Sequence, residues 1–113
     1  MGLRSDLDKT KVRYVYFLLD QNETILYVGT STNPKQRYKT HLKRATTENA
    51  LLYQFVRKHQ ISLKLHVVCM IKSTYAEAEK LEISYIEKHQ ATCLNFYNNP
   101  DKDRLEKIKQ SLN

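Results

Sequence analysis

The sequence predicts an α+β fold, in which a three-stranded antiparallel sheet is flanked by helices in the order β-β-α-α-β-α and a C-terminal helix follows. Two observations support this prediction. Runs rich in β-branched and aromatic residues alternate with segments of helical periodicity, and helix start signals precede several of those segments. The chain of 113 residues has no internal repeat, so residues 1–113 are predicted to form a single domain with a core over about 12–99.

The first two strands are predicted to form a hairpin. Residues 12–19 (VRYVYFLL) and 25–30 (ILYVGT) have strand composition, and residues 20–23 (DQNE) between them have the composition of a turn. Gly29 is the only glycine after position 2. A single glycine at the end of a strand typically marks an unusual φ or a close approach to the backbone.

Helices and one more strand follow the hairpin. Asn33 followed by Pro34 is a helix start, and Thr74 with Glu77 has the spacing of a capping box. Thr46 and Thr47 are predicted to restart the chain into a second helix. The strand that follows, LKLHVVCMI, becomes apolar late and is predicted to enter the core. The predicted elements are helices at 34–44 and 48–59, a strand at 63–71, a helix at 74–89, an extended piece at 92–97 and a helix at 101–112.

The composition excludes several classes of protein. The apolar runs are too short to span a bilayer, and the N-terminus has no apolar stretch of the kind that a secretory leader needs. Two cysteines, Cys69 and Cys93, cannot build a disulfide scaffold and are predicted to be reduced core residues. We therefore expect a soluble protein of the cytoplasm.

The charge is strongly basic and unevenly distributed. The chain carries a net charge of +7, and residues 1–60 hold eleven basic and five acidic side chains, a net +6. Such a patch attracts phosphate polymers, because neutralised phosphates release condensed counterions. Solubility alone is the alternative interpretation. Residues 33–44 contain five bases and no acid, and these bases are candidates for nucleic-acid contact: Lys35, Arg37, Lys39, Lys43 and Arg44.

One carboxylate stands in the middle of an apolar helix face. Helical geometry places Glu82 on the same face as its apolar neighbours Ala78, Leu81, Tyr85 and Ile86. A carboxylate there is desolvated unless a base, a cleft or a metal ion compensates it. Two interpretations stay open at this point: a functional carboxylate, or a structural ion pair with Arg37 or Arg13.

The predicted helix at 34–44 has a basic face. Arg37, His41 and Arg44 follow one another at i, i+4 and i+7 and therefore share that face. A guanidinium can donate to two phosphate oxygens at once, so the face suits phosphate recognition. A solvated basic face without a ligand is the alternative.

Taken together, these residues resemble the GIY-YIG nuclease superfamily. The resemblance consists of Val15-Tyr16, then Tyr27-Val28-Gly29, then Arg37 with His41 behind it, the helix around Glu82, and Leu94-Asn95. It runs from about residue 12 to residue 99 in the family's order of elements. The first motif reads Tyr14-Val15-Tyr16 and so lacks the family's glycine.

The resemblance implies a divalent-metal-dependent endonuclease that hydrolyses phosphodiester bonds in DNA. By position, Glu82 would bind Mg²⁺ or Mn²⁺, and Tyr16 would help to deprotonate the attacking water while Tyr27 positions it. A phenol is a poor base at neutral pH, so we expect nearby positive charge to favour the phenolate. Arg37 would hold the scissile phosphate, His41 would assist proton transfer or contact phosphate, and Asn95 would orient the phosphate or a side chain of the site.

Two other functions remain open. A non-catalytic nucleic-acid-binding module could use the same fold, and the substrate of a nuclease could be RNA or single-stranded DNA. The C-terminal helix could pack on the core or mediate a homodimer, since cutting both strands with one active site needs a second copy or a second visit.

Overall fold

The structure is a computed structural model that describes residues 9–112. The expectation that the N-terminus carries no secretory leader falls largely on residues 1–8, which lie outside the described part of the chain. Among residues 9–112, the longest helix has 14 residues, and none is long and apolar enough to cross a membrane.

The strands form one antiparallel sheet, as predicted. β1 (Lys11–Leu19) lies between β2 (Ile25–Ser31) and β3 (Lys64–Ser73), so the order across the sheet is β2-β1-β3. The predicted hairpin of β1 and β2 is confirmed, and each strand agrees with its predicted bounds within one residue. The Asp20 carboxylate closes the turn between them, because it accepts hydrogen bonds from the N–H groups of Asn22 and Thr24.

The helices begin where the sequence places their caps, with one exception. The Asn33 side chain accepts a hydrogen bond from the Gln36 N–H, and Thr74 and Glu77 form the predicted capping box. Asp101 caps the last helix in the same way. The helices are α2 (Pro34–Arg44), α3 (Leu51–Lys58), α4 (Tyr75–Lys88) and α5 (Lys102–Ser111).

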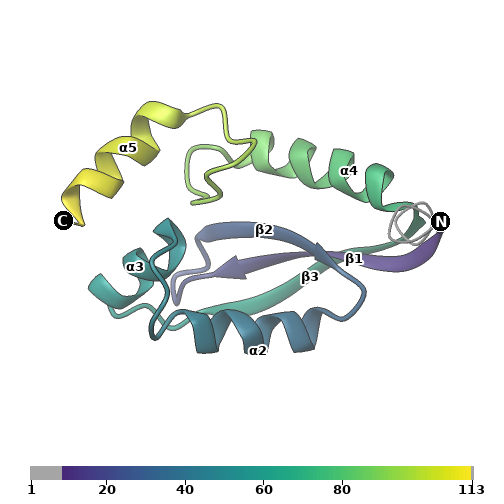
Figure 1. The fold of residues 1–113 in the computed structure, drawn as a ribbon, viewed down its shortest axis with the longest axis horizontal. Coiled ribbons are helices and arrows are strands. Elements are labelled where there is room, and N and C mark those ends of the chain that lie inside the picture. Colours follow the sequence, from purple (N-terminus) through teal and green to yellow (C-terminus); the bar gives the residue numbers. More distant parts are fainter. Residues whose placement is uncertain (1–8, 113) are drawn as a thin grey trace.

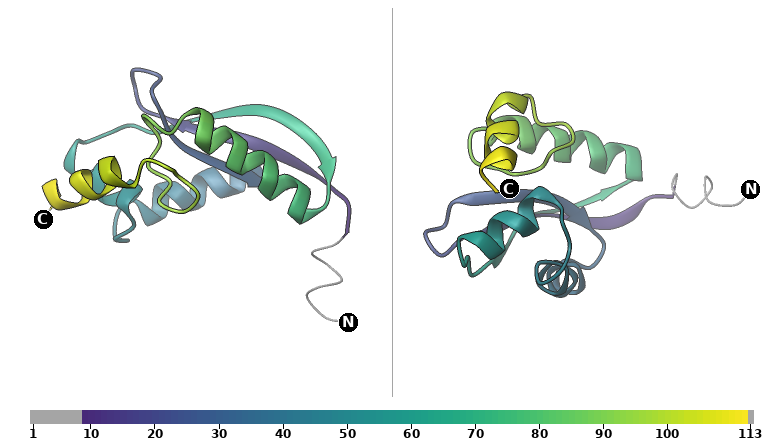
Figure 2. Two further views of the ribbon diagram at one scale, coloured as in Figure 1. Left: turned by 90° about the horizontal axis from the view of Figure 1, so that it is seen from above. Right: turned by 60° about the vertical axis from the view of Figure 1, so that its left-hand side comes forward.

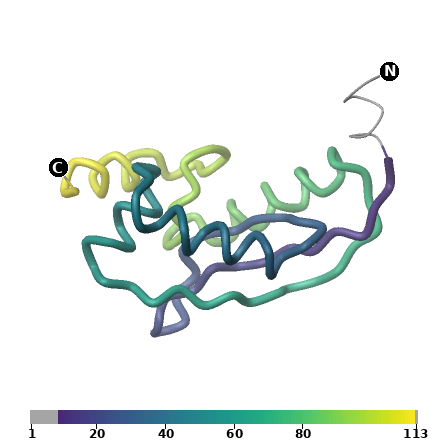
Figure 3. The backbone as a smooth tube through the Cα atoms, turned by 60° about the horizontal axis from the view of Figure 1, so that its bottom comes forward, coloured from purple at the N-terminus to yellow at the C-terminus, as the bar shows by residue number. Residues whose placement is uncertain are grey.

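The sheet is covered on both faces, which gives three layers. α4 lies against one face and α2 and α3 against the other (Figures 1 and 2). Figure 3, turned so that the second face comes forward, shows α2 in front of the strands. Residues 15–18 of the central strand alternate between the two cores and are all buried. The α+β prediction is therefore confirmed.

The C-terminal helix packs on the core. Leu105 of α5 is fully buried in the same core cluster as Leu94 and Leu52, and Ile108 packs against that cluster. The sequence left two roles open for this helix, packing on the core or mediating a homodimer. The structure shows the packing on the core.

α3 begins at Leu51, three residues later than predicted, because side chains hold the preceding segment in turns. The Arg57 guanidinium donates hydrogen bonds to the carbonyl groups of Ala45 and Glu48, and the Glu48 carboxylate pairs with Arg44 at 3.4 Å. These contacts satisfy backbone carbonyls without a helix. Ala50 then takes the N-cap position with extended backbone and no capping side chain.

One further expectation needs correction. β3 lies at the edge of the sheet, where Leu65, Val68 and Cys69 pack against the two core clusters but stay partly exposed and Met70 is 64% exposed. Residues 92–97, predicted as an extended piece, are not part of a strand. They nevertheless run beside β2, since the Leu94 N–H donates to the Leu26 carbonyl at 2.6 Å. Both cysteines are free, with Cys93 buried and Cys69 half-buried.

Candidate active site

A groove of about 370 Å³ lies beside β2, at the outer edge of the sheet. Four residues predicted as catalytic line it, each from a different element: Tyr27 from β2, Arg37 from α2, Glu82 from α4, and Asn95 from the loop after α4. We call it the site groove. Its remaining wall is formed mainly by the start of α3 and by residues 96–98. Residues from both faces of the sheet therefore meet at one edge strand.

Tyr16 is buried, does not line this groove, and lies next to Tyr27 and against Gly29. Tyr16 and Gly29 are partners in the β1–β2 register, and a Cβ built on Gly29 would lie 2.5 Å from both Cζ and Oη of Tyr16. No real Cβ is found so close to another atom. The predicted close approach at Gly29 is therefore confirmed, and it is made by a side chain of the site.

Tyr16 and His41 belong to a chain of buried hydrogen bonds. The Tyr16 hydroxyl lies 2.9 Å from Nε2 of His41, and Nδ1 of the same ring lies 2.9 Å from the Tyr53 hydroxyl. Both Tyr16 and His41 are 1% exposed, and Tyr53 is also buried. A neutral imidazole has one N–H, so His41 donates to one phenol and accepts from the other. The ring is therefore an internal link and not part of a solvated basic face.

His41 is held neutral in the folded protein. Its pKa is lowered from 6.5 to about 4, mainly by burial and to a smaller extent by the positive charges of Arg37 and Arg44. The titratable and charged groups that face the ring come from four elements: Arg37 and Arg44 of α2, Tyr16 of β1, Tyr27 of β2 and Tyr53 of α3.

This shift predicts acid destabilisation. As pH falls from 6.5 towards 4 the unfolded chain takes up the His41 proton first, so the free energy of unfolding should fall over that window, by about 3 kcal/mol in total. Urea unfolding at pH 7.5 and pH 4.5 measures the fall. A His41→Gln variant should lose less stability between these pH values, and an equal loss in both proteins would contradict the assignment.

Burial also raises the pKa of both site tyrosines. For Tyr16 and for Tyr27, loss of solvent is the largest cause, and the charge of Arg37 opposes it without cancelling it. Arg37 lowers the pKa of both phenols, as expected of a nearby positive charge, but desolvation raises the pKa of each by more. Both phenols are neutral donors in the protein alone.

Glu82 is half-buried on α4, as the periodicity predicts. Its Oε1 lies 3.5 Å from the Thr30 hydroxyl on β2, and no ion pair involves it within residues 9–112. Arg13 is engaged elsewhere, with the Ser73 carbonyl and the Tyr75 ring. Burial raises the pKa of the Glu82 carboxyl, with Thr30 and Arg37 acting in the opposite direction. The carboxylate therefore lies in the site groove with no ion pair to any of residues 9–112.

Asn95 fixes the loop to the edge strand. Its Oδ1 accepts from the Val28 N–H and its Nδ2 donates to the Val28 carbonyl, both at 2.9 Å. The side chain thus pairs with β2 as a neighbouring strand would. Since both polar atoms of its amide are engaged, Asn95 positions the wall of the site groove beside Tyr27.

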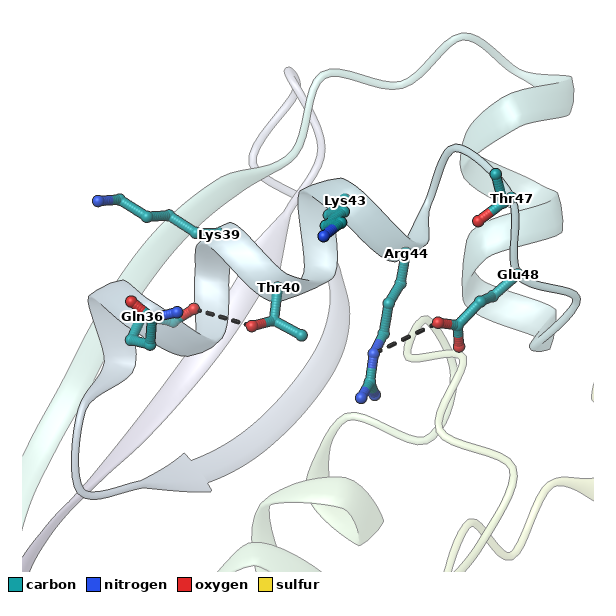
Figure 4. A pocket seen from close by; sticks show the side chains of 7 residues that line it. All are labelled: Gln36, Lys39, Thr40, Lys43, Arg44, Thr47 and Glu48. Carbon is teal, nitrogen blue, oxygen red and sulfur yellow. Dashed lines mark hydrogen bonds and ion pairs between the residues drawn. The ribbon is translucent and has the colours of Figure 1, made fainter.

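The predicted basic residues divide between two hollows. Lys39, Lys43 and Arg44 line a hollow of about 440 Å³ on α2, which we call the basic hollow, whereas Lys35 lines a different one. Figure 4 shows the Arg44 side chain reaching Glu48 while Lys39 points away from it. Arg44 and Glu48 line both the basic hollow and the site groove, so the two adjoin at this ion pair.

Tyr53 is the site residue that the sequence did not reveal. The predicted inward stripe of its helix consisted of Leu51, Leu52, Phe55 and Val56. In the structure Tyr53 is buried instead of Phe55 or Leu51, which are partly exposed, and its hydroxyl bonds to His41. The available signal was its spacing, because Tyr53 stands three residues before Val56 and next to Leu52, on the face that the structure buries.

Comparison with protein families gives one match. The family model described as GIY-YIG catalytic domain matches residues 12–98, which is most of the chain. Neither the curated proteins nor the solved structures contain a match. The match covers the sheet, the groove and all six residues predicted as catalytic. The chain therefore belongs to the GIY-YIG catalytic domain family and is a nuclease-type hydrolase, with nucleic acid as the substrate that this implies.

Proposed function

We propose that this protein is a divalent-metal-dependent endonuclease that hydrolyses phosphodiester bonds in DNA. The observation that supports this most is the convergence in the site groove. Arg37 and Glu82 come from helices on opposite faces of the sheet and line the same groove, which Tyr27 of the edge strand β2 also lines, and a hydrogen-bonded Tyr16–His41 pair is buried nearby. A scaffold has no need to gather these groups at a solvent-facing edge.

The groove suits a hard divalent cation held by Glu82. Within residues 9–112 there is no cluster of three or more His, Cys, Asp or Glu side chains that could hold a metal ion. The side chains of these residues alone would therefore not complete the coordination shell of the ion. Mg²⁺ is commonly held by one or two carboxylates, with waters and substrate phosphate completing the shell. A half-buried carboxylate with a raised pKa and no ion pair fits that role. When bound, the ion would stabilise negative charge on the phosphate oxygens.

The remaining groups would handle the phosphate and the proton. Arg37 would donate to non-bridging oxygens of the scissile phosphate and stabilise the charge that develops there. Tyr27 at the groove wall would hold the water that attacks phosphorus. As Tyr16 takes a proton from this water, it would pass its own proton to Nε2 of His41, so that no free phenolate is needed. The oxygen of one deoxyribose would leave as an alkoxide and take up a proton from solvent, and His41 would return its proton to solvent.

His41 is prepared for this transfer by its other partner. If Nδ1–H donates to the Tyr53 hydroxyl, Nε2 is left as the acceptor that faces Tyr16. Tyr53 would thus be a positioning residue that selects the reactive tautomer. The basic hollow, with Lys39, Lys43 and Arg44, would bind the backbone of the same strand beyond the cut.

A cleavage assay with a matched pair of carboxylate variants tests the proposal. Wild-type protein with supercoiled plasmid should nick one strand at a time in Mg²⁺ or Mn²⁺, and EDTA should abolish the nicking. Glu82→Gln should lower the rate by about 10²-fold or more, because it removes the negative charge that would hold the ion. The control is Glu79→Gln, an exposed carboxylate of the same helix, which should cut at the wild-type rate.

Each alternative predicts a different result. Undiminished cutting by Glu82→Gln would refute the proposed mechanism. Retardation of DNA in a gel without cleavage in any divalent metal would identify a binding module instead. Cleavage of RNA and not of DNA under the same conditions would change the substrate while leaving the site intact.

A further inference from the structure

A second hollow adjoins the site groove on the side of α5. It has a volume of about 310 Å³ and shares Ala50, Leu51, Phe96 and Tyr97 with the groove. Polar side chains complete its lining, namely Asn49, Gln54 and Lys109. We call it the aromatic hollow. A strand bound at Arg37 and Glu82 can therefore extend into it without leaving the protein surface.

Tyr97 is unusually exposed for an aromatic side chain. It is 84% exposed, the highest value among the exposed large hydrophobic residues of the described chain. Burial against the rest of the protein therefore does not explain why a tyrosine occupies this position. Its ring meets Phe96 edge-on, with centroids 6.4 Å apart, so one face of an aromatic platform remains open to solvent beside the groove.

The loop that carries Tyr97 is anchored on both sides. Before it, Asn95 is bonded to Val28 of the edge strand. After it, the buried Asn99 amide donates to the Cys93 carbonyl, and its oxygen accepts from the Asp101 N–H. A ring on an anchored loop can receive a partner without ordering the backbone first, which lowers the entropic cost of binding.

Positive charge surrounds the same platform. Lys102 lies over the Phe96 ring at 4.5 Å and also donates to the Phe96 carbonyl, and Lys109 lies 6.0 Å from the same ring centroid. One aromatic face with flanking ammonium groups is the combination that recognises a nucleotide, since the base stacks and its phosphate meets the cations.

We propose that the aromatic hollow is a subsite for one unpaired base, which stacks on Tyr97 while its strand is held in the site groove. This inference rests on the proposed nuclease function and narrows its substrate. A base inside a duplex is stacked on both faces, so it cannot also stack on Tyr97. The preferred substrate is therefore DNA with a single-stranded segment next to the cut.

Fluorescence of 2-aminopurine tests the subsite directly. Single-stranded oligonucleotides with this base at successive positions are titrated with wild-type protein in EDTA. One position should be quenched by stacking, and Tyr97→Ala should abolish that quenching and weaken single-strand affinity by about 10-fold. Tyr97→Phe keeps a stacking ring and should retain the quenching. Tyr75→Ala, which removes an exposed tyrosine at the start of α4 that does not line the aromatic hollow, should match wild type.

The possible outcomes are distinct. Quenching that survives in Tyr97→Ala, or no quenching at any position, overturns the subsite. A dimer that Tyr97→Ala dissociates, with no effect on the oligonucleotides, would assign the hollow to a second copy of the chain and overturn it as well. Because the titration contains no divalent metal, it does not depend on cleavage, and failure of the nuclease function would appear separately as an inactive wild-type enzyme in Mg²⁺.

Discussion

Arg37→Ala is expected to lower the rate of metal-dependent DNA cleavage by about 10²–10³-fold, the cost typical of losing one donor to a developing oxyanion. The Arg37 guanidinium lines the site groove with Glu82. Its positive charge lowers the pKa of Tyr16, Tyr27 and Glu82. Removing it takes away a charge that matters most in the transition state. Single-turnover cleavage at saturating protein measures the loss without the contribution of binding.

Arg44→Ala is the matched control for this variant. Arg44 lies two helical turns further along α2, lines the same groove and is 42% exposed. Its loss should weaken DNA binding and reduce the salt dependence by about one phosphate contact, with little effect on the single-turnover rate. Equal rate losses in the two variants would show that Arg37 contributes only general attraction.

Gly29→Ala is expected to destabilise the fold and to disable the site together. The new methyl group would fall 2.5 Å from the ring and hydroxyl of Tyr16, which is buried and hydrogen-bonded to His41 and so has no free space into which it can move. Overpacking of this kind costs about 1–3 kcal/mol. Urea unfolding measures this cost, and a cleavage assay should show a parallel loss of activity.

A double-mutant cycle identifies the cause of this destabilisation. In a Tyr16→Leu background the shorter side chain no longer reaches over residue 29, so Gly29→Ala should cost much less there. The same cost in both backgrounds would place the effect of alanine in the backbone of β2 and not in the contact with Tyr16.

Local sequence patterns predicted the parts of the site that depend on one element at a time. The helical period of α4 placed Glu82 on its apolar face, and the capping residues Asn33 and Thr74 marked where α2 and α4 begin. The single glycine of β2 indicated a close approach before its partner was known. Each of these features is set by neighbours within one helix or one hairpin, so sequence alone determines it.

The features that sequence missed depend on contacts between distant elements. α3 starts late because Arg57 reaches back to the Ala45 and Glu48 carbonyls, and the Tyr53 hydroxyl bonds to His41 of another helix. Helical periodicity cannot detect such a contact. Likewise, the raised pKa of Tyr16 follows from burial under Gly29 and α2, a tertiary property that outweighs the visible positive charge of Arg37.

The central claim is that the Glu82 carboxylate holds a divalent ion next to the phosphate bound at Arg37. Electron paramagnetic resonance of Mn²⁺ with an oligonucleotide tests it most directly, with Arg37→Ala as the background so that the substrate survives. The account predicts one bound Mn²⁺ per chain in Arg37→Ala and in Arg37→Ala with Glu79→Gln, and none in Arg37→Ala with Glu82→Gln. Binding of one Mn²⁺ per chain by that last protein would contradict the claim.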